Sequence, residues 1–292
     1  IGFRKLGKLT HQSKWKKSVF QIYKDASINF RWTSELYKEC KKNKIDFMTS
    51  PYDLEYVDRV EKFICAYKIG SGDITWKEIL KKIEKKNKPI ILATGASSLK
   101  DVKTAVKILT KRKKIILMQC NTNYTNSKNN FDFININVLK TYKKLFKNKI
   151  ILGLSDHTHG HATVLGAVAL GAKYVEKHFT DDNSRKGPDH LFSMNPKTWT
   201  EMVIETSNLE RAMGNGSKVI EKNERDSVIV QRRAAYASRN IAKDEKIVQE
   251  DIIFLRPCPK NSLIGFEENK IYGKKAKKNI KQGELINTKC LV

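Results

Sequence analysis

The sequence predicts an α/β protein in which parallel strands alternate with helices, followed by a small β-rich domain. Three observations support this prediction. Short apolar runs recur, mostly at steps of 22–26 residues, segments of helical period lie between them, and each run ends in polar residues. The six runs start near residues 45, 67, 89, 115, 150 and 172.

The distribution of polar residues distinguishes two parallel-sheet architectures. An open doubly wound sheet concentrates its site at one switch point, whereas a (β/α)8 TIM barrel carries functional residues at the carboxyl ends of several strands. Polar residues follow all six runs here, so we favour the barrel over the open sheet, which six strands also permit. Since a barrel needs eight strands, we expect the first two to be lacking here and two βα units to precede residue 1.

The expected elements follow one another along the chain. Strands are expected at 45–50, 66–70, 89–95, 115–120, 150–154 and 172–175. Helices are expected at 33–42, 52–63, 76–86, 98–110, 136–146, 162–170 and 196–213, where apolar residues recur at three- and four-residue steps. Thr33, Ser97 or Ser98, and Asn195 stand at positions where a side-chain oxygen can cap a helix.

The character of the sequence changes near residue 234 to short strands with turns. We expect a partial barrel domain over 1–215, a linker over 216–231 and the β-rich domain over 232–292. A faint repeat in this last domain predicts two pseudo-symmetric halves: Arg239-Asn240-Ile241 with Glu245 and Ile247 recurs as Lys278-Asn279-Ile280 with Glu284 and Ile286. About 60 residues is near the lower limit for independent stability, so we expect this domain to dock on another surface.

The composition argues against several classes of protein. The formal net charge is +26, but 46 of the 57 basic residues are lysines without interleaved aromatic residues. This pattern predicts solvated faces and steering of anionic substrates rather than nucleic-acid binding. No apolar run approaches the roughly 18–20 residues of a membrane helix. The five cysteines are widely spaced without a CxxC pair, and no signal-peptide pattern opens the chain, so we expect a cytoplasmic protein with reduced thiols and no membrane contact.

Side chains that can bind metals follow two strands that are consecutive in the chain. They are Ser155, Asp156 and His157 after the first strand, and Glu176 and His178 after the second. Alternate residues of a strand share a face, so Glu176 and His178 are expected to point the same way. Two imidazoles beside carboxylates suit a divalent transition metal such as Mn²⁺ or Zn²⁺, with positions left for water or substrate. Hydrogen-bonded core histidines are the alternative.

One lysine is predicted to lie inside the barrel. Lys68 stands between Tyr67 and Ile69 in a strand, so its side chain points away from the face that these two residues share. An ammonium group in that position needs an anion nearby. Neutral donors end this strand and the others: Ser71, Gly72, Thr94, Gly95, Asn121 and Ser155. Such a ring predicts a site for a phosphate or carboxylate, and ordinary helix capping is the alternative.

Several segments resemble the sialic acid synthase family, which makes N-acetylneuraminate and related nonulosonic acids. The matching segments are YKIGSGD (67–73), PIILATG (89–95), QCNTNY (119–124), LSDHTHG (154–160), EKHFTDD (176–182), GPDH (187–190) and IYGKK (271–275). The resemblance covers about residues 30–292. Its most specific part is the combination of SDHT, EKHFT and GPDH, and the C-terminal part resembles the family's antifreeze-like (SAF) domain.

The resemblance implies a reaction and a set of residue roles. The family's barrel condenses phosphoenolpyruvate with N-acetylmannosamine or a related N-acyl amino sugar, giving a nonulosonic acid and phosphate. His157 and His178 would hold a divalent metal, Mn²⁺ or Mg²⁺. Phosphoenolpyruvate would be held by Lys68, Ser71, Ser155, Asn121 and Asn123, with Thr94 as a further candidate. The sugar end would be lined by Asp73, Tyr124, Glu176 and Asp189, and the candidate catalytic residues are His157, His178, Glu176 and Asp189.

The resemblance also implies an assembly. Arg256, in the segment FLRP, would reach the acyl group of the sugar from the partner subunit of a domain-swapped homodimer. Neuraminate, legionaminate and pseudaminate synthases share these motifs, so the motifs leave the choice among the three products open.

Two other functions stay open at this point. The segment His157-Thr158-His159-Gly160-His161 fits a different metal-dependent barrel of the amidohydrolase kind, which would bind zinc tightly and would not depend on phosphoenolpyruvate. The second is a truncated or degenerate copy that binds sugar or dimerises without catalysing a reaction.

Overall fold

The computed structural model describes residues 16–110, 114–125, 127–187 and 189–292. The chain divides into two compact units, 1–214 and 215–292, and each has its own hydrophobic core. Within the described ranges, no helix is both long and apolar enough to cross a membrane.

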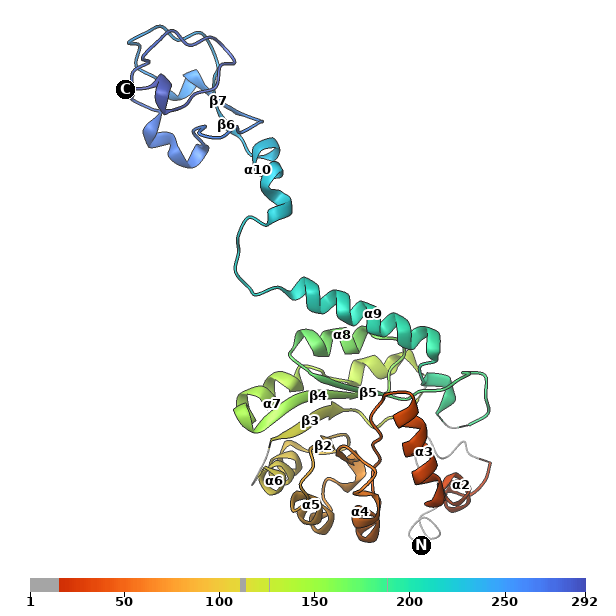
Figure 1. Ribbon diagram of the computed structural model, residues 1–292. Helices are drawn as coiled ribbons and strands as arrows, with labels where there is room; N and C mark the ends of the chain where they lie inside the picture. The colour runs from red at the N-terminus through yellow and green to blue at the C-terminus, as the bar shows by residue number, and fades with distance from the viewer. Residues whose placement is uncertain (1–15, 111–113, 126, 188) are drawn as a thin grey trace. The chain divides into compact units, whose positions relative to one another are not determined.

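A five-stranded parallel sheet forms the centre of the first unit (Figure 1). Its strands pair in chain order: β1 (Tyr67–Ile69), β2 (Ile90–Ala93), β3 (Ile115–Cys120), β4 (Ile150–Asp156) and β5 (Tyr174–Lys177). Parallel neighbours in chain order require a crossover between every two strands, and a helix supplies each one. The predicted alternation of parallel strands and helices is confirmed.

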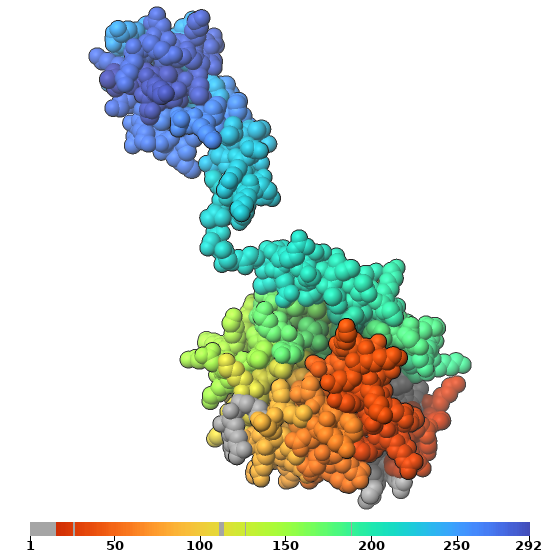
Figure 2. Space-filling view, viewed as in Figure 1, coloured from red at the N-terminus to blue at the C-terminus, as the bar shows by residue number. Residues whose placement is uncertain are grey.

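Helices cover one face of this sheet. They are α4 (Leu54–Val60), α5 (Lys77–Glu84), α6 (Leu99–Leu109), α7 (Val138–Phe146), α8 (Ala162–Ala169) and α9 (Pro196–Met213), each of which contributes to the core beneath them; α2 (Val19–Ala26) and α3 (Arg31–Lys42) precede them in the chain. Helix α9 packs along α8 and lies on the surface of this unit, where Figure 2 shows it in teal. Ser98 and Asn195 are confirmed as caps, since their side-chain oxygens accept hydrogen bonds from the backbone N–H groups of Asp101 and Thr198.

Residues 45–50 do not form the predicted strand. They run beside β1, where the Cys65 N–H donates to the Phe47 carbonyl and Thr49 pairs with Tyr67, but this single bridge makes no regular ladder. Strand propensity alone does not produce a ladder, because a strand also needs consecutive paired backbone groups on its neighbour.

The prediction of Thr33 as a helix cap is wrong. Helix α3 begins at Arg31, and Thr33 lies within it, 8% exposed. The Arg31 N–H is instead satisfied by the side-chain oxygen of Asn29, at 3.0 Å. An upstream Asn that already binds the free N–H groups extends the helix past the residue that the sequence pattern favours.

Alternation along the strands separates two apolar layers. Tyr67, Ile69 and Leu92 belong to the core that packs under the helices. Ala66, Ile91, Ile116 and Met118 form a second buried group on the other face, joined by Ile151. The sheet is therefore covered on its outer face by helices, and its inner face has an apolar floor below the carboxyl ends of the strands.

An ion pair shows that the sheet is strongly curved. Lys68 lies in β1 and Glu176 in β5, the two edge strands of the sheet. Four strand spacings would separate these edges by about 19 Å in a flat sheet. The Lys68 Nζ and Glu176 Oε1 atoms are nevertheless only 2.9 Å apart. Both side chains therefore project into the concave face of a partial barrel, as the barrel prediction requires.

The second unit contains helix α10 (Arg225–Gln231) and an antiparallel pair, β6 (Ala234–Ala237) and β7 (Ile252–Leu255). The predicted two-fold repeat is confirmed here. Ile241 and Ile280, equivalent in the repeat, pair with each other in both directions. The Asn240 side chain accepts from the Gln282 N–H and the Asn279 side chain accepts from the Lys243 N–H, both at 2.8 Å.

Candidate active site

Most of the predicted site residues gather on the concave face, at the carboxyl ends of the strands. The cluster consists of Lys68 in β1, Ser155 in β4, Glu176 in β5, and the following Ser71, Tyr124, His157, His178 and Asp189. This is the edge at which parallel barrels hold their sites.

The two histidines are brought together. Their ring centroids lie 5.0 Å apart at an interplanar angle of 64°. His157 is 4% exposed, and its Nδ1 lies 2.6 Å from the backbone carbonyl oxygen of Asn121. A carbonyl only accepts, so Nδ1 carries the proton and Nε2 keeps a free lone pair. Burial lowers the pKa of His157, which favours the neutral ring.

The second histidine is oriented by a carboxylate and by aromatic rings. His178 Nδ1 lies 3.5 Å from Asp189 Oδ2. Tyr124 packs against both imidazoles, with centroids 4.4 Å from His157 and 5.6 Å from His178. The ring centroid of Phe192 lies 6.2 Å from that of His157 and 5.1 Å from that of His178. The rings form an apolar wall, which restricts the motion of both imidazoles.

This donor set fits a divalent metal ion. A metal-binding histidine typically donates its other ring N–H to a carbonyl or carboxylate, as His157 does to Asn121. Two imidazole ligands suit Mn²⁺ or a similar ion and leave several coordination positions for water or substrate. Within the described ranges, no group of three or more His, Cys, Asp or Glu side chains is placed to hold a metal.

The three-histidine alternative finds no support in this geometry. His161 is the residue before helix α8, and His159 lies in the preceding bend, after the strand alternation has ended. The partner of His157 is His178 from the next strand. The HTHGH segment therefore resembles a ligand set in spacing only.

A positively charged group lies beside the histidines. Lys68, whose side chain is 13% exposed, donates to Glu176 Oε1 at 2.9 Å, and Ser155 donates to the same oxygen at 2.9 Å. Glu176 itself is 42% exposed at its side chain. The prediction that Lys68 points into the barrel is confirmed. An anionic substrate that displaced this carboxylate would meet an ammonium and a hydroxyl already oriented.

The turn after β1 closes tightly on the turn after β2. The Ser71 hydroxyl accepts a hydrogen bond from the Gly95 N–H at 2.9 Å. A Cβ at Gly95 would lie 2.4 Å from Thr122 Cγ2 and 3.1 Å from Cys120 Sγ. Glycine is thus required at position 95 so that the loop after β3 can approach the turn after β2. This loop carries Tyr124, which contacts both histidines.

Thr94 and Asp156 do not join the cluster. The Thr94 hydroxyl donates to the Met118 carbonyl and contacts the Tyr142 hydroxyl at 3.0 Å, in the layer under the helices. Asp156 faces the same layer and pairs with Lys177 at 2.6 Å. Alternation explains both outcomes, because a residue next to an inward-facing one points outward.

The asparagines of the loop after β3 use their polar groups to shape it. The Asn121 side chain donates to the Phe133 carbonyl at 3.2 Å and accepts from the Asn123 N–H at 3.0 Å. The Asn123 side chain lies 3.4 Å from Asn130 Oδ1. Asn121 contributes to the site through its backbone carbonyl, which holds His157. The sequence pattern did not reveal this backbone contact.

Two further predicted residues lie apart from these contacts. Asp73 ends the short 3-10 turn Ser71–Asp73 after β1, and burial raises the pKa of its carboxyl group. Arg256 belongs to the second unit, where its Nε donates to the Gln231 carbonyl at 2.6 Å. The segment 187–190 contains Pro188, which lies outside the described residues.

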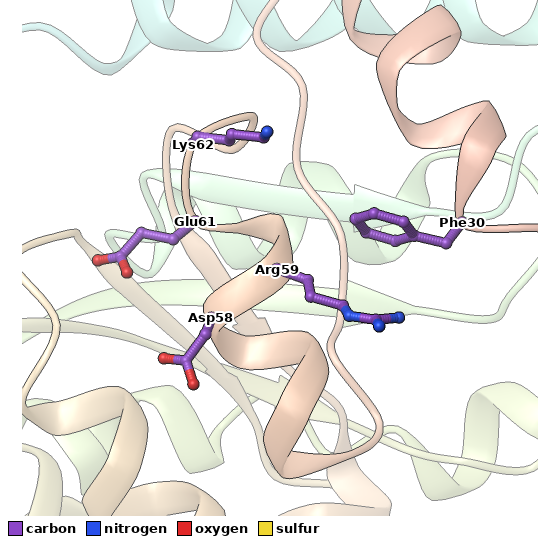
Figure 3. A pocket seen from close by; sticks show the side chains of 5 residues that line it. All are labelled: Phe30, Asp58, Arg59, Glu61 and Lys62. Carbon is purple, nitrogen blue, oxygen red and sulfur yellow. The ribbon is translucent and has the colours of Figure 1, made fainter.

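A hollow of about 410 Å³ lies elsewhere in the first unit and is not this site. Figure 3 shows its lining by Phe30, Asp58, Arg59, Glu61 and Lys62. Asp58 pairs with Lys82 and Lys86, and the Arg59 guanidinium stacks over Phe30. Asp58 and Arg59 are therefore already engaged within the protein, and we interpret the hollow as a gap beside helix α4.

Sequence reasoning missed two neighbours of the histidines. Phe192, 3% exposed, follows the GPDH segment and backs both rings. Cys120 ends β3, where burial raises the pKa of its thiol, and its Sγ lies 4.0 Å from His157 Nδ1. A single apolar residue in a short 3-10 helix, as Phe192 is, carries no periodic signal. The position of Cys120 at the end of a predicted strand was a signal that could have identified it.

Comparison with known proteins agrees with this geometry. Residues 4–218 match the model of the NeuB family, and residues 232–292 match that of the SAF domain. The chain is 36% identical over 275 residues to the N,N'-diacetyllegionaminic acid synthase of Campylobacter jejuni, covering 92% of this chain and 80% of that one. It is 29% identical to a pseudaminic acid synthase of the same organism, covering 93% and 78%.

A solved structure extends the likeness to three dimensions. The N-acetylneuraminic acid synthetase of Leptospira borgpetersenii superposes with a TM-score of 0.65 at 26% identity, covering 76% of this chain and 77% of that one. Homology over most of the chain and the arrangement at the strand ends lead to the same conclusion. The chain belongs to the NeuB family of sialic-type acid synthases, with an SAF domain after its barrel unit.

Proposed function

We propose that this protein condenses phosphoenolpyruvate with the open-chain aldehyde of an N-acyl amino sugar, giving a nonulosonic acid and inorganic phosphate. The observation that carries the proposal is the position of the His157 and His178 imidazoles, whose ring centroids lie 5.0 Å apart, at the same barrel rim as the Lys68–Glu176–Ser155 network. The two imidazoles suit a metal ion that binds an aldehyde oxygen, and the Lys68–Glu176–Ser155 network suits a phosphorylated enol.

In the proposed reaction, C3 of phosphoenolpyruvate forms a bond to the aldehyde carbon of the sugar, and the aldehyde oxygen becomes a hydroxyl group. Water then adds at C2, and the bond between C2 and the bridging oxygen breaks. Phosphate departs with that oxygen, and the product is a keto acid whose keto oxygen comes from the water. A Mn²⁺ or Mg²⁺ ion held by His157 and His178 would supply Lewis-acid polarisation of the aldehyde.

The protein's own groups have distinct tasks in this proposal. The Lys68 ammonium and the Ser155 hydroxyl bind the carboxylate or phosphate of phosphoenolpyruvate and stabilise its charge. Ser71, Asn121 and Asn123 shape the phosphate end.

The remaining groups act at the sugar end. Asp73, Glu176 and Asp189 bind sugar hydroxyl groups. Tyr124 and Phe192 exclude water from the side of the imidazoles.

The relatives suggest which sugar is used. The N,N'-diacetyllegionaminic acid synthase of Campylobacter jejuni matches this chain at higher identity than the N-acetylneuraminate-9-phosphate synthase of Homo sapiens does, 36% against 30%. We therefore expect an acceptor with two acetamido groups to be preferred over N-acetylmannosamine. The protein acts as a domain-swapped homodimer in this proposal, with Arg256 of each subunit reaching the sugar's acyl group in the other.

The test measures phosphate release from phosphoenolpyruvate with Mn²⁺ and either sugar. Release is expected with the wild type, and it is expected to disappear with a chelator or with His178→Ala. Unchanged turnover in His178→Ala would remove the metal assignment. Release of ammonia or acetate without phosphoenolpyruvate, supported by zinc, would favour an amidohydrolase.

The proposed assembly has its own test. Light scattering should give twice the chain mass, and Arg256→Ala should raise KM for the sugar while leaving KM for phosphoenolpyruvate unchanged.

A further inference from the structure

A buried ion pair lies directly behind the two histidines, on the face of the sheet that packs under the helices. Asp156 ends β4 and Lys177 ends β5, and the two residues are register partners. Their side chains are 0% and 1% exposed, and the Lys177 Nζ lies 2.6 Å from Asp156 Oδ2. Taking two full charges out of water is costly, so a pair this deeply buried needs nearly complete hydrogen bonding.

The hydrogen bonding of this pair extends to both neighbouring segments. Asp156 Oδ1 accepts from the Thr158 N–H at 3.0 Å, and Oδ2 accepts from the Thr163 hydroxyl at 2.5 Å. The Thr158 hydroxyl lies 3.0 Å from both carboxylate oxygens. Lys177 donates a second hydrogen bond, at 2.7 Å, to the Thr158 carbonyl. The cluster thus joins the ends of β4 and β5 to the start of helix α8.

The positions of the histidines relative to this cluster are informative. His157 lies between Asp156 and Thr158, so the backbone is held on both sides of it. His178 follows Lys177 directly. The bond from Lys177 to the Thr158 carbonyl crosses from β5 to the chain beyond β4, and therefore fixes the two histidine-bearing segments relative to each other.

We propose that Asp156 and Lys177 are positioning residues that set the separation and orientation of the His157 and His178 rings. This inference rests on the proposed metal-dependent function. Stability alone is a poor reason to retain such a pair, because well-packed apolar residues of similar volume often replace a buried ion pair without loss of stability. Ring placement does require it, since a binding site loses function when its ligands shift by fractions of an ångström.

Stability and positioning can be separated by comparing single and double substitutions. Asp156→Asn and Lys177→Met each leave one buried charge without its partner, so both are expected to lower Tm. The double variant Asp156→Leu/Lys177→Met removes both charges and is expected to recover most of Tm. Its Mn²⁺ dissociation constant, measured by electron paramagnetic resonance, is nevertheless expected to rise at least tenfold, the usual effect of losing groups that orient metal ligands.

Two milder variants and a control keep the test informative if the charge variants do not fold. Thr163→Val removes one donor to Asp156 and is expected to weaken Mn²⁺ binding severalfold, whereas Thr163→Ser should restore it. Tyr142→Phe removes a buried hydroxyl from the same layer, next to Thr94, and should leave Mn²⁺ binding unchanged.

A metal-free measurement complements the affinities. Long-range ¹H–¹⁵N spectra should show His157 of the wild type as a single tautomer protonated at Nδ1. In the double variant, the His157 ring is expected to move away from the Asn121 carbonyl that selects this tautomer, so both tautomers should appear. A double variant that binds Mn²⁺ as tightly as the wild type and keeps the single tautomer would overturn the inference. If the wild type itself binds no Mn²⁺, or His178→Ala binds it equally well, the proposed metal site fails instead.

Discussion

Replacing Lys68 by methionine separates the role of this lysine in the fold from its role in the reaction. Methionine keeps most of the volume of the side chain and removes its charge. Glu176 then loses one of the two donors to Oε1 but keeps Ser155. Because the Glu176 side chain is 42% exposed, water can replace the lost donor, and the pair is expected to contribute only about 0.5–1 kcal/mol to stability. Tm should fall by only about 1–4 °C.

The effect on catalysis should be much larger. If the Lys68 ammonium binds the anionic group of phosphoenolpyruvate in the transition state, its loss should cost about 2.7–4 kcal/mol, or a factor of about 10²–10³ in kcat/KM. The assay is the initial rate of phosphate release as phosphoenolpyruvate is varied at saturating sugar and Mn²⁺, with Tm measured on the same sample.

Lys86→Met is a matched control for this experiment. The Lys86 side chain is 19% exposed and pairs at 2.6 Å with both Asp58 of helix α4 and Glu61, the residue that follows this helix, away from the strand ends. The same substitution there should lower Tm by at least as much and leave phosphate release unchanged. A Lys68→Met variant whose kcat/KM for phosphoenolpyruvate stays within threefold of that of Lys86→Met would refute the assignment of Lys68.

Three further outcomes test other parts of the structure. Burial raises the pKa of Asp73 above its ordinary 3.8. Just above that value the folded state therefore binds more protons than the unfolded state, and the stability of the protein falls as pH rises from the unfolded to the folded pKa of this carboxyl group. Asp73→Asn should therefore raise Tm near neutral pH but not below about pH 4, while raising KM for the sugar; a Tm gain that persists in acid would contradict this. Gly153→Ala would place a Cβ 2.8 Å from Met118 Cγ and 3.0 Å from a backbone oxygen, so it should cost about 1–3 kcal/mol in urea unfolding. Asn240→Ala and Asn279→Ala remove equivalent hydrogen bonds and should each destabilise the C-terminal unit by about 1 kcal/mol; clearly unequal losses would show that the two halves are not energetically equivalent.

Local patterns in the sequence were sufficient for much of the architecture. The alternation of Tyr67, Lys68 and Ile69 showed which way the lysine points, and the spacing of Glu176 and His178 placed them on one face. Period and capping signals located helix α9 at 196–213 with the bounds that the structure shows. These inferences succeeded because each depends on backbone geometry within a few residues.

Other features depended on contacts between segments far apart in the chain. Whether residues 45–50 form a strand depends on the pairing that β1 provides, and no local pattern reports that pairing. Thr94 follows its strand as a polar residue, and alternation turns it outward, but its contact with the Tyr142 hydroxyl depends on how helix α7 packs against the sheet.

The amino-acid sequence by itself determined the order of the elements, the face on which each strand residue lies and the family of the chain. Only the tertiary structure decided which polar groups meet: that Lys68 reaches Glu176 across the curved sheet, that the Asn121 carbonyl selects the tautomer of His157, and that Lys177 of the next strand is the partner of Asp156. The physical reason is that side-chain direction is a local property of the backbone. Distances between side chains depend on the curvature and register of the whole sheet.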